Sequence, residues 1–334
     1  MKHFLTGALT ATALAIALGS CGANANAGNG TASSTDSIAA ADTIPTVYFI
    51  REISPESLQK IYAALGRKAE GKVAVKISTG ESKKSNQLDP QLIKPLVDEV
   101  KGTLVECCTA YGGSRSTPVT AYQTAIDHGY TAIAPVDIMD SIGSDTLFVA
   151  EYRHLPYDLV GSRFTDYDFM VVLSHFKGHQ MAGFGGALKN MAIGIASADG
   201  KAWVHTAGKT TNPAELWNNI PADSIFQESM AEACEAIINH IGDKVVYINV
   251  ANNLSIDCDC NGNPAPAELA DLGIFASLDP VAVDRACVDA VRQSPDHGKQ
   301  HLIERIEERR APHLLDYAEH LGLGKQHYNL IKIK

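Results

Sequence analysis

The order of strand-like and helix-like segments in the first 130 residues restricts the fold of this chain more than any other feature. Residues 46–50, 72–78 and 102–108 are apolar, largely β-branched runs that are typical of buried strands. Each run is followed by an amphipathic helical pattern, at 54–66, 90–100 and 117–128. This alternation predicts an α/β fold in which a mostly parallel, mixed sheet carries helices on both faces.

The alternation resumes after an irregular stretch at 137–154, which we interpret as an antiparallel excursion from the sheet. Apolar runs and helical periodicity then predict strands at 169–173, 244–250 and 272–277 and helices at 223–241, after 280 and at 299–323. Residues 44–334 therefore form one α/β domain in this interpretation, or two subdomains of it.

The first 21 residues have the pattern of a lipoprotein signal peptide. Lys2 precedes an apolar run that is too short for a typical membrane span, and the run ends in Leu-Gly-Ser-Cys21. That tetrapeptide resembles the bacterial lipobox, in which the cysteine is lipidated. Cleavage after Ala25 or Ala27, giving a soluble exported protein, is the alternative. We expect an exported bacterial lipoprotein, periplasmic or at the outer membrane, that is anchored through Cys21 and a flexible tether at 22–43.

The composition limits the partners that the domain is expected to bind. Lys and Arg number 28 against 38 Asp and Glu, so the formal net charge is −10. A negatively charged protein is repelled by nucleic acid and by anionic membrane surfaces. We therefore expect a small-molecule or metal ligand, no nucleic-acid partner, and membrane contact only through the N-terminal lipid.

Residues 174–205 carry the densest group of functional side chains in the sequence. The strand expected at 169–173 leads directly into histidines and lysines that are separated by glycines. A strand that ends in a Gly-rich polar loop before a helix is how α/β proteins build sites at the carboxyl ends of their strands. Three other loops, at 76–81, 111–115 and 279–284, have the same plan. If the strands are parallel, these loops share one edge of the sheet and form one site.

Two sets of candidate residues follow from that convergence. Positive and polar side chains, with backbone N–H groups of the Gly-rich stretch, are expected to bind an anionic ligand: Lys76, Glu81, Ser114, Arg115, Gly186, Asn190 and Lys201. The candidate catalytic residues are Lys177, Lys189 and Asp279, with a lysine as acid or base. Each has a structural alternative, because polar loops need no ligand, glycines allow close packing, and Asp279 before a proline is a helix cap.

The Cys258-Asp259-Cys260 motif can supply two ligands for a divalent metal. His179 and His205 are the residues that we expect to complete the site. A disulfide between the two cysteines and a pair of ordinary thiols are the alternatives. The sequence contains no serine nucleophile elbow, zinc-protease motif or dinucleotide fingerprint, and no cysteine array for an iron–sulfur cluster.

Several of these motifs occur in the order found in a known family. The segments Phe176-Lys-Gly-His179, Ala187-Leu-Lys-Asn190 and Asp257-Cys-Asp-Cys260, with Gly200-Lys201 and His205, resemble the domain-of-unknown-function family 362. Members of that family are often labelled iron–sulfur-centre or ferredoxin-like proteins. The resemblance implies a cysteine-rich ferredoxin insert after His205, but residues 206–221 contain no cysteine. We therefore expect no iron–sulfur cluster in this chain.

Two hypotheses of different classes follow. The first is an exported lipoprotein that binds a metal or a small anionic ligand at the strand-end loops and uses it in a metal- or redox-dependent reaction. The second is a non-catalytic periplasmic binding protein with the same pocket.

Overall fold

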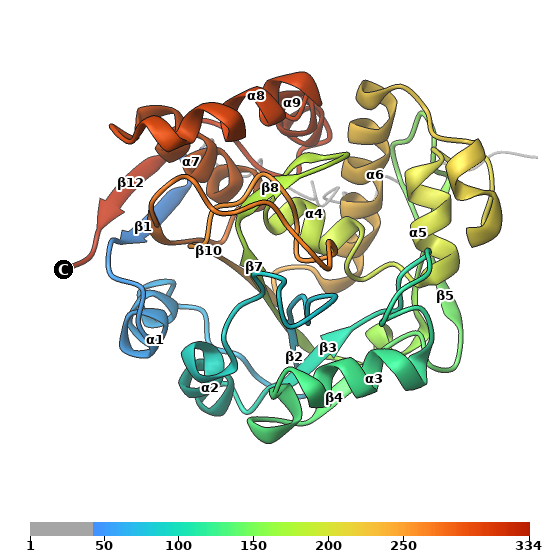
Figure 1. Ribbon diagram of the computed structural model, residues 1–334, viewed down its shortest axis with the longest axis horizontal. Helices are drawn as coiled ribbons and strands as arrows, with labels where there is room; N and C mark the ends of the chain where they lie inside the picture. Colours follow the sequence, from blue (N-terminus) through green and yellow to red (C-terminus); the bar gives the residue numbers. More distant parts are fainter. Residues whose placement is uncertain (1–42) are drawn as a thin grey trace, which may run out of the picture. The chain divides into compact units, whose positions relative to one another are not determined.

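An eight-stranded mixed sheet runs through residues 43–334, the part of the chain that the computed structural model describes (Figure 1). The predicted signal peptide, Cys21 and all but the last residue of the predicted tether lie outside the described residues. The strands are, in spatial order, β12 (Asn329–Lys332), β1 (Thr46–Ile50), β11 (Gly273–Ser277), β10 (Val245–Ala251), β7 (Phe169–His175), β2 (Val73–Lys76), β3 (Thr103–Glu106) and β4 (Val136–Ile138).

Within this sheet β11 runs antiparallel to both of its neighbours, β1 and β10, and all other pairs are parallel. The mostly parallel, mixed sheet expected from the sequence is therefore confirmed. Figure 1 shows the first and last strands, β1 and β12, side by side at one edge. The β12 strand was not expected from the sequence, since it follows a charge-rich helical region.

Helices cover both faces of the sheet, as predicted. They are α1 (Pro55–Ala64), α2 (Pro90–Glu99), α3 (Pro118–Asp127), α4 (Ala187–Ala192), α5 (Ala198–His205), α6 (Asp223–Ile241), α7 (Pro280–Gln293), α8 (Gln300–Glu308) and α9 (Pro312–His320). Side chains alternate across the sheet: Val73 and Val75 pack with α1 and α2, whereas Ala74 packs with α4, α6 and α7. Lys76 continues the Ala74 face, so the sheet itself aims this lysine at the α4 side.

Short local signals set the starts of several helices. Ser54, Asp89 and Thr117 cap α1, α2 and α3, and each accepts a hydrogen bond from a backbone N–H of the first turn. A proline follows every one of these caps at the first helical position, where its missing N–H costs nothing. The predicted boundaries of these three helices are accordingly within two residues of the observed ones, whereas the helix expected at 299–323 is divided into α8 and α9.

Two small hairpins lie outside the main sheet. The antiparallel strands β5 (Ser144–Phe148) and β6 (Tyr157–Gly161) form the first; β5 lies within the excursion expected at 137–154, and β6 lies beyond its end. The strands β8 (Lys177–His179) and β9 (Gly183–Gly185) form a second hairpin inside the Gly-rich stretch, where a loop was expected. Four short 3₁₀ helices complete the described chain: Tyr130–Ala132, Ser162–Asp166, Pro213–Asn218 and His297–Lys299.

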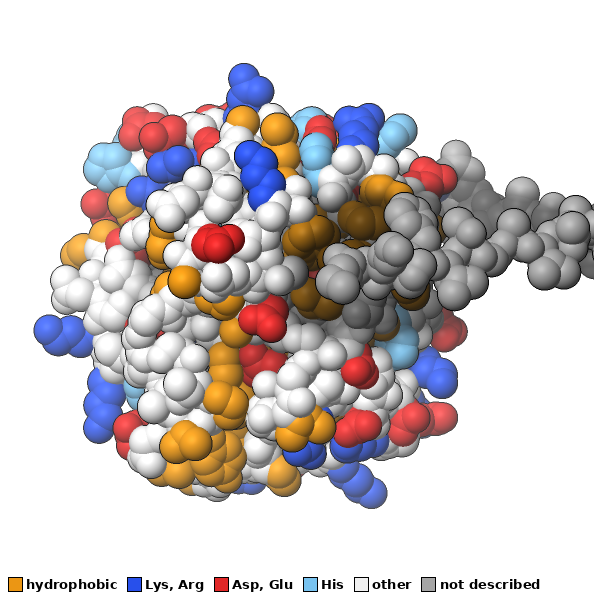
Figure 2. Space-filling model, turned by 90° about the vertical axis from the view of Figure 1, so that its right-hand side faces the viewer, with side chains coloured by type: hydrophobic (Ala, Val, Ile, Leu, Met, Phe, Trp, Pro, Cys, Tyr) orange, Lys and Arg blue, Asp and Glu red, His pale blue; other side chains and the backbone are white. Residues whose placement is uncertain are grey.

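The surface carries charges of both signs. On the face drawn in Figure 2, Lys and Arg side chains lie among Asp and Glu side chains and form no continuous basic patch. Among residues 43–334, no helix combines the length and the apolar character needed to cross a membrane.

Candidate ligand-binding pocket

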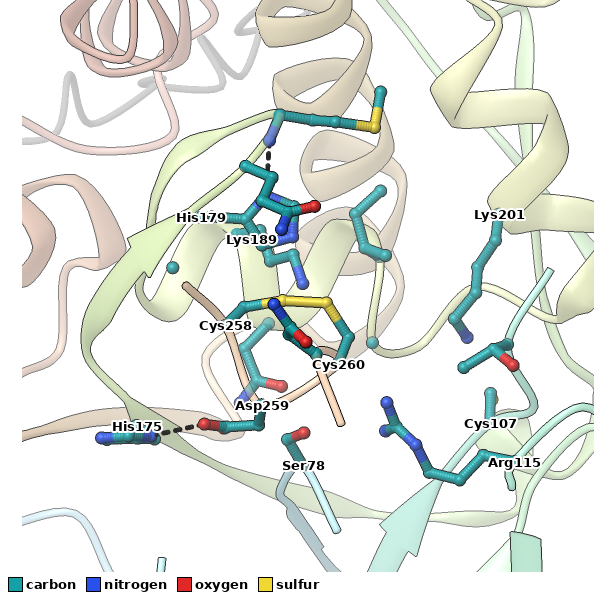
Figure 3. A pocket seen from close by; sticks show the side chains of 18 of the residues that line it. Ser78, Cys107, Arg115, His175, His179, Lys189, Lys201, Cys258, Asp259 and Cys260 are labelled. Atoms are coloured by element: carbon teal, nitrogen blue, oxygen red, sulfur yellow. Dashed lines mark hydrogen bonds and ion pairs between the residues drawn. A yellow bond between two sulfur atoms is a disulfide. The ribbon is translucent and has the colours of Figure 1, made fainter. Parts of the chain in front are cut away.

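A cavity of about 410 Å³ lies at the carboxyl ends of β2, β3 and β7 (Figure 3). Its walls come from the ends of these strands, from α4 and α5, and from the loop that follows β10. The strand-end loops thus come together as predicted, with one exception. The predicted site residues that line the cavity are Lys76, Arg115, Lys177, His179, Gly186, Lys189, Asn190, Lys201, His205, Cys258 and Cys260.

The exception is Asp279, which does not line this cavity. Asp279 follows β11, which is antiparallel to β10. The carboxyl end of β11 therefore pairs with the amino-terminal half of β10, at the opposite edge of the sheet, where Ser277 faces Tyr247. Asp279 caps α7 instead and accepts hydrogen bonds from the N–H groups of Ala282, at 2.8 Å, and Lys325, at 2.9 Å. Asp279 was expected in the shared site on the condition that its strand was parallel to the others, and the antiparallel direction of β11 is the reason why it lies elsewhere.

Glu81 and Ser114 also lie behind the cavity wall rather than in it. The Ser114 hydroxyl donates to the carbonyl of Glu81 at 2.6 Å, and the Ser114 N–H donates to the Glu81 carboxylate. The same carboxylate pairs with Arg115 at 3.1 Å. These two residues hold the loops after β2 and β3 together and position Arg115, so their predicted direct contact with the ligand is not found.

The Gly-rich stretch binds an anion that belongs to the chain itself. The buried Asp284 carboxylate accepts hydrogen bonds from Ala187 N–H at 2.7 Å and Leu188 N–H at 3.0 Å, at the start of α4. A side chain at Gly186 would place its Cβ 2.3 Å from Asp284 Oδ1, so glycine is required there. Backbone N–H groups at the start of a helix favour an anion, and Asp284 fills that role; the backbone cradle expected for an external ligand is therefore already occupied.

Asn190 connects the strand ends beneath the cavity. Its amide nitrogen donates to the carbonyls of Lys76 and Leu173, both at 3.3 Å, and lies 3.1 Å from the Ser174 hydroxyl oxygen. These contacts tie the ends of β2 and β7 to α4. Asn190 thereby fixes the position of the neighbouring Lys76.

A buried carboxylate that was not singled out in the sequence, Glu106, anchors two of the predicted cations. Its oxygens accept from Lys76 Nζ at 2.9 Å and Arg115 Nη1 at 3.3 Å, and from Thr79 N–H at 3.0 Å. Burial by itself would raise the pKa of Glu106, but the two cations outweigh burial and lower the pKa to about 2. The available sequence signal was an acidic residue at the end of a buried strand.

A second buried carboxylate, Asp259, lies between the two cysteines of the Cys-Asp-Cys motif. It accepts from Lys177 Nζ at 2.7 Å and from His175 Nδ1 at 2.8 Å, while His175 Nε2 donates to the carbonyl of Asn252 at 2.6 Å. Burial opposes ionisation, but His175 and Lys177 hold the pKa of Asp259 well below its usual range. The loop after β10 is thus attached to the end of β7 and to β8 by charged hydrogen bonds.

Two other lysines of the pocket have no carboxylate partner among the described residues. Lys201 Nζ donates to the carbonyl of Ala196 at 2.7 Å. The Lys189 side chain is half-buried, and its Nζ makes no hydrogen bond or ion pair with any residue of 43–334. Burial first, then the charges of Lys177 and Lys76, lower the pKa of Lys189 to about 7. The Lys189 ammonium therefore loses its charge as the pH rises through neutral, and it faces the cavity without a side-chain partner among residues 43–334.

Backbone N–H groups fix the tautomer of His179. The N–H groups of Met181 and Ala182 both donate to His179 Nδ1, at 3.2 and 2.9 Å. A ring nitrogen that accepts hydrogen bonds is unprotonated, so the neutral ring carries its proton on Nε2 and is a donor there. Burial and the nearby Lys189 hold the pKa of His179 well below its usual range, which keeps the ring neutral.

His205 has the reverse arrangement. Its Nδ1 lies 2.6 Å from the carbonyl oxygen of Lys201, so Nδ1 carries the proton and Nε2 keeps a lone pair. Burial lowers the pKa of His205 to about 4, although the hydrogen bond to Lys201 opposes this shift. The ring stacks on Phe226 with 5.0 Å between ring centroids. His205 is thus a neutral acceptor in the pocket wall.

The four predicted metal ligands do not form a metal site in this state. Among residues 43–334 one group of three or more His, Cys, Asp or Glu side chains has ligand atoms within 4.8 Å of one another: His179, Cys258 and Cys260. His205 does not join them. Cys258 and Cys260 are bonded in a disulfide, so neither sulfur is the thiolate that a metal binds, and His179 presents an N–H. In the oxidised protein the disulfide alternative describes the motif. Metal binding by His179, Cys258 and Cys260 would first require reduction of the disulfide, and it stays a prediction.

Aromatic side chains lie at one end of the cavity. Tyr111 and Trp217, the latter from the 3₁₀ helix Pro213–Asn218, are 6.3 Å apart between ring centroids, and both line the cavity. Trp217 is 61% exposed, which is unusual for so large an apolar side chain. The pocket thus combines a charged interior with an aromatic end.

The comparisons with known proteins give a family and a distant structural likeness. The model of the family described as Domain of unknown function (DUF362) matches residues 73–289. No curated protein matches the chain. The lactate racemase apoprotein from Thermoanaerobacterium thermosaccharolyticum is similar at 14% identity with a TM-score of 0.43, over 73% of this chain and 56% of that one. A protein from Thermotoga maritima is similar at 16% identity with a TM-score of 0.39, over 71% and 58%. The chain spans little more than half the length of these two proteins.

Proposed function

The chain belongs to the DUF362 family, whose description assigns no activity, and from its pocket we propose that the protein binds a small anionic ligand at the carboxyl edge of the sheet. The excess of positive charge in the pocket carries this proposal. Five cationic side chains and two carboxylates line the cavity: Lys76, Arg115, Lys177, Lys189 and Lys201 against Glu106 and Asp259. The whole chain, in contrast, has a net charge of −10.

The position of the unpaired charge defines where the anion binds. Glu106 and Asp259 neutralise much of the field of Lys76, Arg115 and Lys177. Lys189 and Lys201 have no carboxylate partner among the described residues, so an anion can pair with them, and His179 Nε2 adds a neutral donor from the same wall. An anion between these groups would receive charge-assisted hydrogen bonds, which are about twice as strong as neutral ones.

The size and lining of the cavity indicate the class of ligand. A volume of about 410 Å³ is suited to a metabolite rather than to a polymer segment. The anionic group would lie at the lysines, and an apolar part would pack on Tyr111 and Trp217. Small carboxylates and phosphate monoesters with a short apolar portion have this combination.

Thermal unfolding of the full chain tests the proposal. Ligand that binds only the folded state raises Tm, and succinate at ten times its Kd is expected to raise it by about 2–4 °C. Putrescine, a dication of similar length at equal ionic strength, is expected to give no rise. The rise should disappear in Lys189→Met/Lys201→Met and persist in Lys68→Met, a matched control at an exposed lysine that precedes β2. An equal rise with putrescine, or a rise that persists in the double variant, would contradict the proposal.

We also propose that this pocket is displayed outside the cytoplasm by a lipid anchor on Cys21. The support is the lipobox-like sequence at 18–21 and the Gly/Ala/Asn/Ser-rich segment after it. Cells fed labelled palmitate should label the wild-type protein and not Cys21→Ser, and the variant should leave the membrane fraction. Equal labelling of the two proteins would contradict the anchor.

A further inference from the structure

The Cys258–Cys260 disulfide lies in the wall of the pocket and not in the protein core. Both cysteines line the cavity, and Cys260 is only partly buried. A ring nitrogen of His179 lies within 4.8 Å of both sulfurs. Figure 3 shows the Lys189 side chain pointing toward the disulfide from α4. A sulfur–sulfur bond is thus exposed to any molecule that occupies the cavity.

The loop that carries the disulfide is held in place independently of the sulfurs. Asp259 is bonded to Lys177 and His175, and its carbonyl accepts from Glu81 N–H at 2.8 Å. Gly178 N–H donates to the carbonyl of Ser255 at 2.8 Å, and a Cβ at Gly178 would lie 2.4 Å from the Ile256 carbonyl oxygen. Because these contacts do not involve Cys258 or Cys260, the two sulfurs stay adjacent when their bond is broken.

The surroundings of this pair favour thiolate chemistry. Cationic groups near a cysteine stabilise its thiolate, and the thiolate is the reactive form in disulfide exchange. Lys189 and His179 supply positive charge and an N–H donor beside the sulfurs. The four free cysteines of the described chain are different, since burial raises the pKa of Cys107, Cys108, Cys234 and Cys287. Those four remain protonated and inert.

We propose that Cys258–Cys260 is a redox-active disulfide that exchanges with small anionic thiols and disulfides bound in the pocket. The selectivity for anions rests on the proposed function, whereas the reactivity of the disulfide does not. Lys189 is the proton donor and acceptor for the sulfurs. Lys177 and His175 are positioning residues, because they hold Asp259 and with it the loop that carries the two cysteines.

The exchange balances in two steps. A bound thiolate attacks Sγ of Cys260, which belongs to the more exposed of the two cysteines. A new sulfur–sulfur bond forms and the Cys258–Cys260 bond breaks. Cys258 leaves as a thiolate and takes a proton from the Lys189 ammonium. A second thiolate attacks the substrate sulfur of the mixed disulfide and releases Cys260 as a thiolate. Two thiolates are thereby oxidised to one small disulfide, while the protein disulfide is reduced to a Cys258 thiol and a Cys260 thiolate. The reverse sequence, with a small disulfide as the oxidant, restores the protein.

Differential alkylation of the full-length protein tests this inference. The oxidised protein is incubated with mercaptoacetate, 2-mercaptoethanol or cysteamine at equal thiolate concentration, quenched with iodoacetamide, and the peptide containing Cys258 and Cys260 is analysed by mass spectrometry. After each rate is divided by that of the same thiolate with the urea-unfolded protein, which removes differences in intrinsic nucleophilicity, we expect mercaptoacetate to open the disulfide about ten times faster than cysteamine, since one favourable charge contact is worth roughly that factor.

Matched variants test the part that Lys189 plays, and the succinate result separates the disulfide chemistry from the binding of anions. Lys189→Met should slow opening by mercaptoacetate at least about ten-fold, as expected for loss of an acid–base group, whereas Lys68→Met should react like the wild type. The inference would be overturned if the peptide is already alkylated before any thiol is added, or if its disulfide stays closed with all three thiols in the folded protein. The proposed function would still stand in either case if succinate raises Tm. Fast opening at equal rates with all three thiols would support the redox site and overturn its selectivity for anions.

Discussion

The pocket contains two kinds of lysine, and the difference between them shows which charges hold the fold and which are available to a ligand. Lys76 and Lys177 each have a buried carboxylate within 2.9 Å, Glu106 and Asp259 respectively. Lys189 and Lys201, in the same cavity, have none among the described residues. A buried ion pair approximately offsets its own desolvation, so the paired lysines maintain the loops. The unpaired lysines keep a field that a bound anion can use.

The largest effect is expected from breaking one of the pairs. Glu106→Gln removes the charge that faces Lys76 and Arg115, and loss of one partner of a buried pair typically costs about 3–5 kcal/mol of unfolding free energy. Urea unfolding measures this cost. Glu70→Gln, at an exposed site, should change the free energy by less than about 0.5 kcal/mol. A cost below about 1 kcal/mol for Glu106→Gln would mean that the paired lysines are not structural.

An intermediate effect is expected from titrating the unpaired lysine. The pKa of Lys189 is about 7, so its ammonium is present below that pH and is lost as the pH rises through it. Sulfate, which does not itself titrate in this range, should bind about ten times more weakly at pH 8 than at pH 6. Calorimetric titration of Lys189→Met should show weak binding at both pH values. An unchanged affinity of the wild type between pH 6 and 8 would assign the anion to another group.

The smallest effect is expected at the opposite edge of the sheet. Asp279→Ala removes the cap of α7 and should cost about 1 kcal/mol of stability. Sulfate affinity should not change, because Asp279 does not line the pocket. Asp279→Asn, which can still cap, should restore most of the loss. Loss of sulfate binding in a folded Asp279→Ala protein would show that this residue acts in the site after all.

Much of the fold could be predicted because its signals are local. Cap–proline pairs such as Ser54-Pro55 and Thr117-Pro118 determine where helices begin, and β-branched runs determine the central strands. Strand direction has no local signal. The antiparallel β11 has the same apolar pattern as the parallel strands of the sheet. Only its pairing with β1 and β10 reveals its direction. This is why Asp279 was expected at the wrong edge of the sheet.

The cationic residues of the site could be predicted from the sequence, but the carboxylates that pair with them could not. Lys76, Lys177 and Lys189 stand out in the sequence because they follow strands or glycines. Whether a lysine is neutralised depends on a carboxylate from elsewhere in the chain, 30 residues away for Glu106 and 82 for Asp259. The sequence likewise left the Cys258–Cys260 pair open among metal ligand, disulfide and free thiols, because spacing does not determine oxidation state or the donor atoms that face the sulfurs.

The central claim is that the unpaired lysines bind an anion, and a crystal structure grown with selenate tests it most directly. The selenium atom can be located by its anomalous scattering. We expect an anomalous peak in the cavity within about 4 Å of Lys189 Nζ, the distance of a charged contact, and no such peak in crystals of Lys189→Met/Lys201→Met. A cavity without selenate in the wild-type protein, at a concentration that fills other surface sites, would contradict the account.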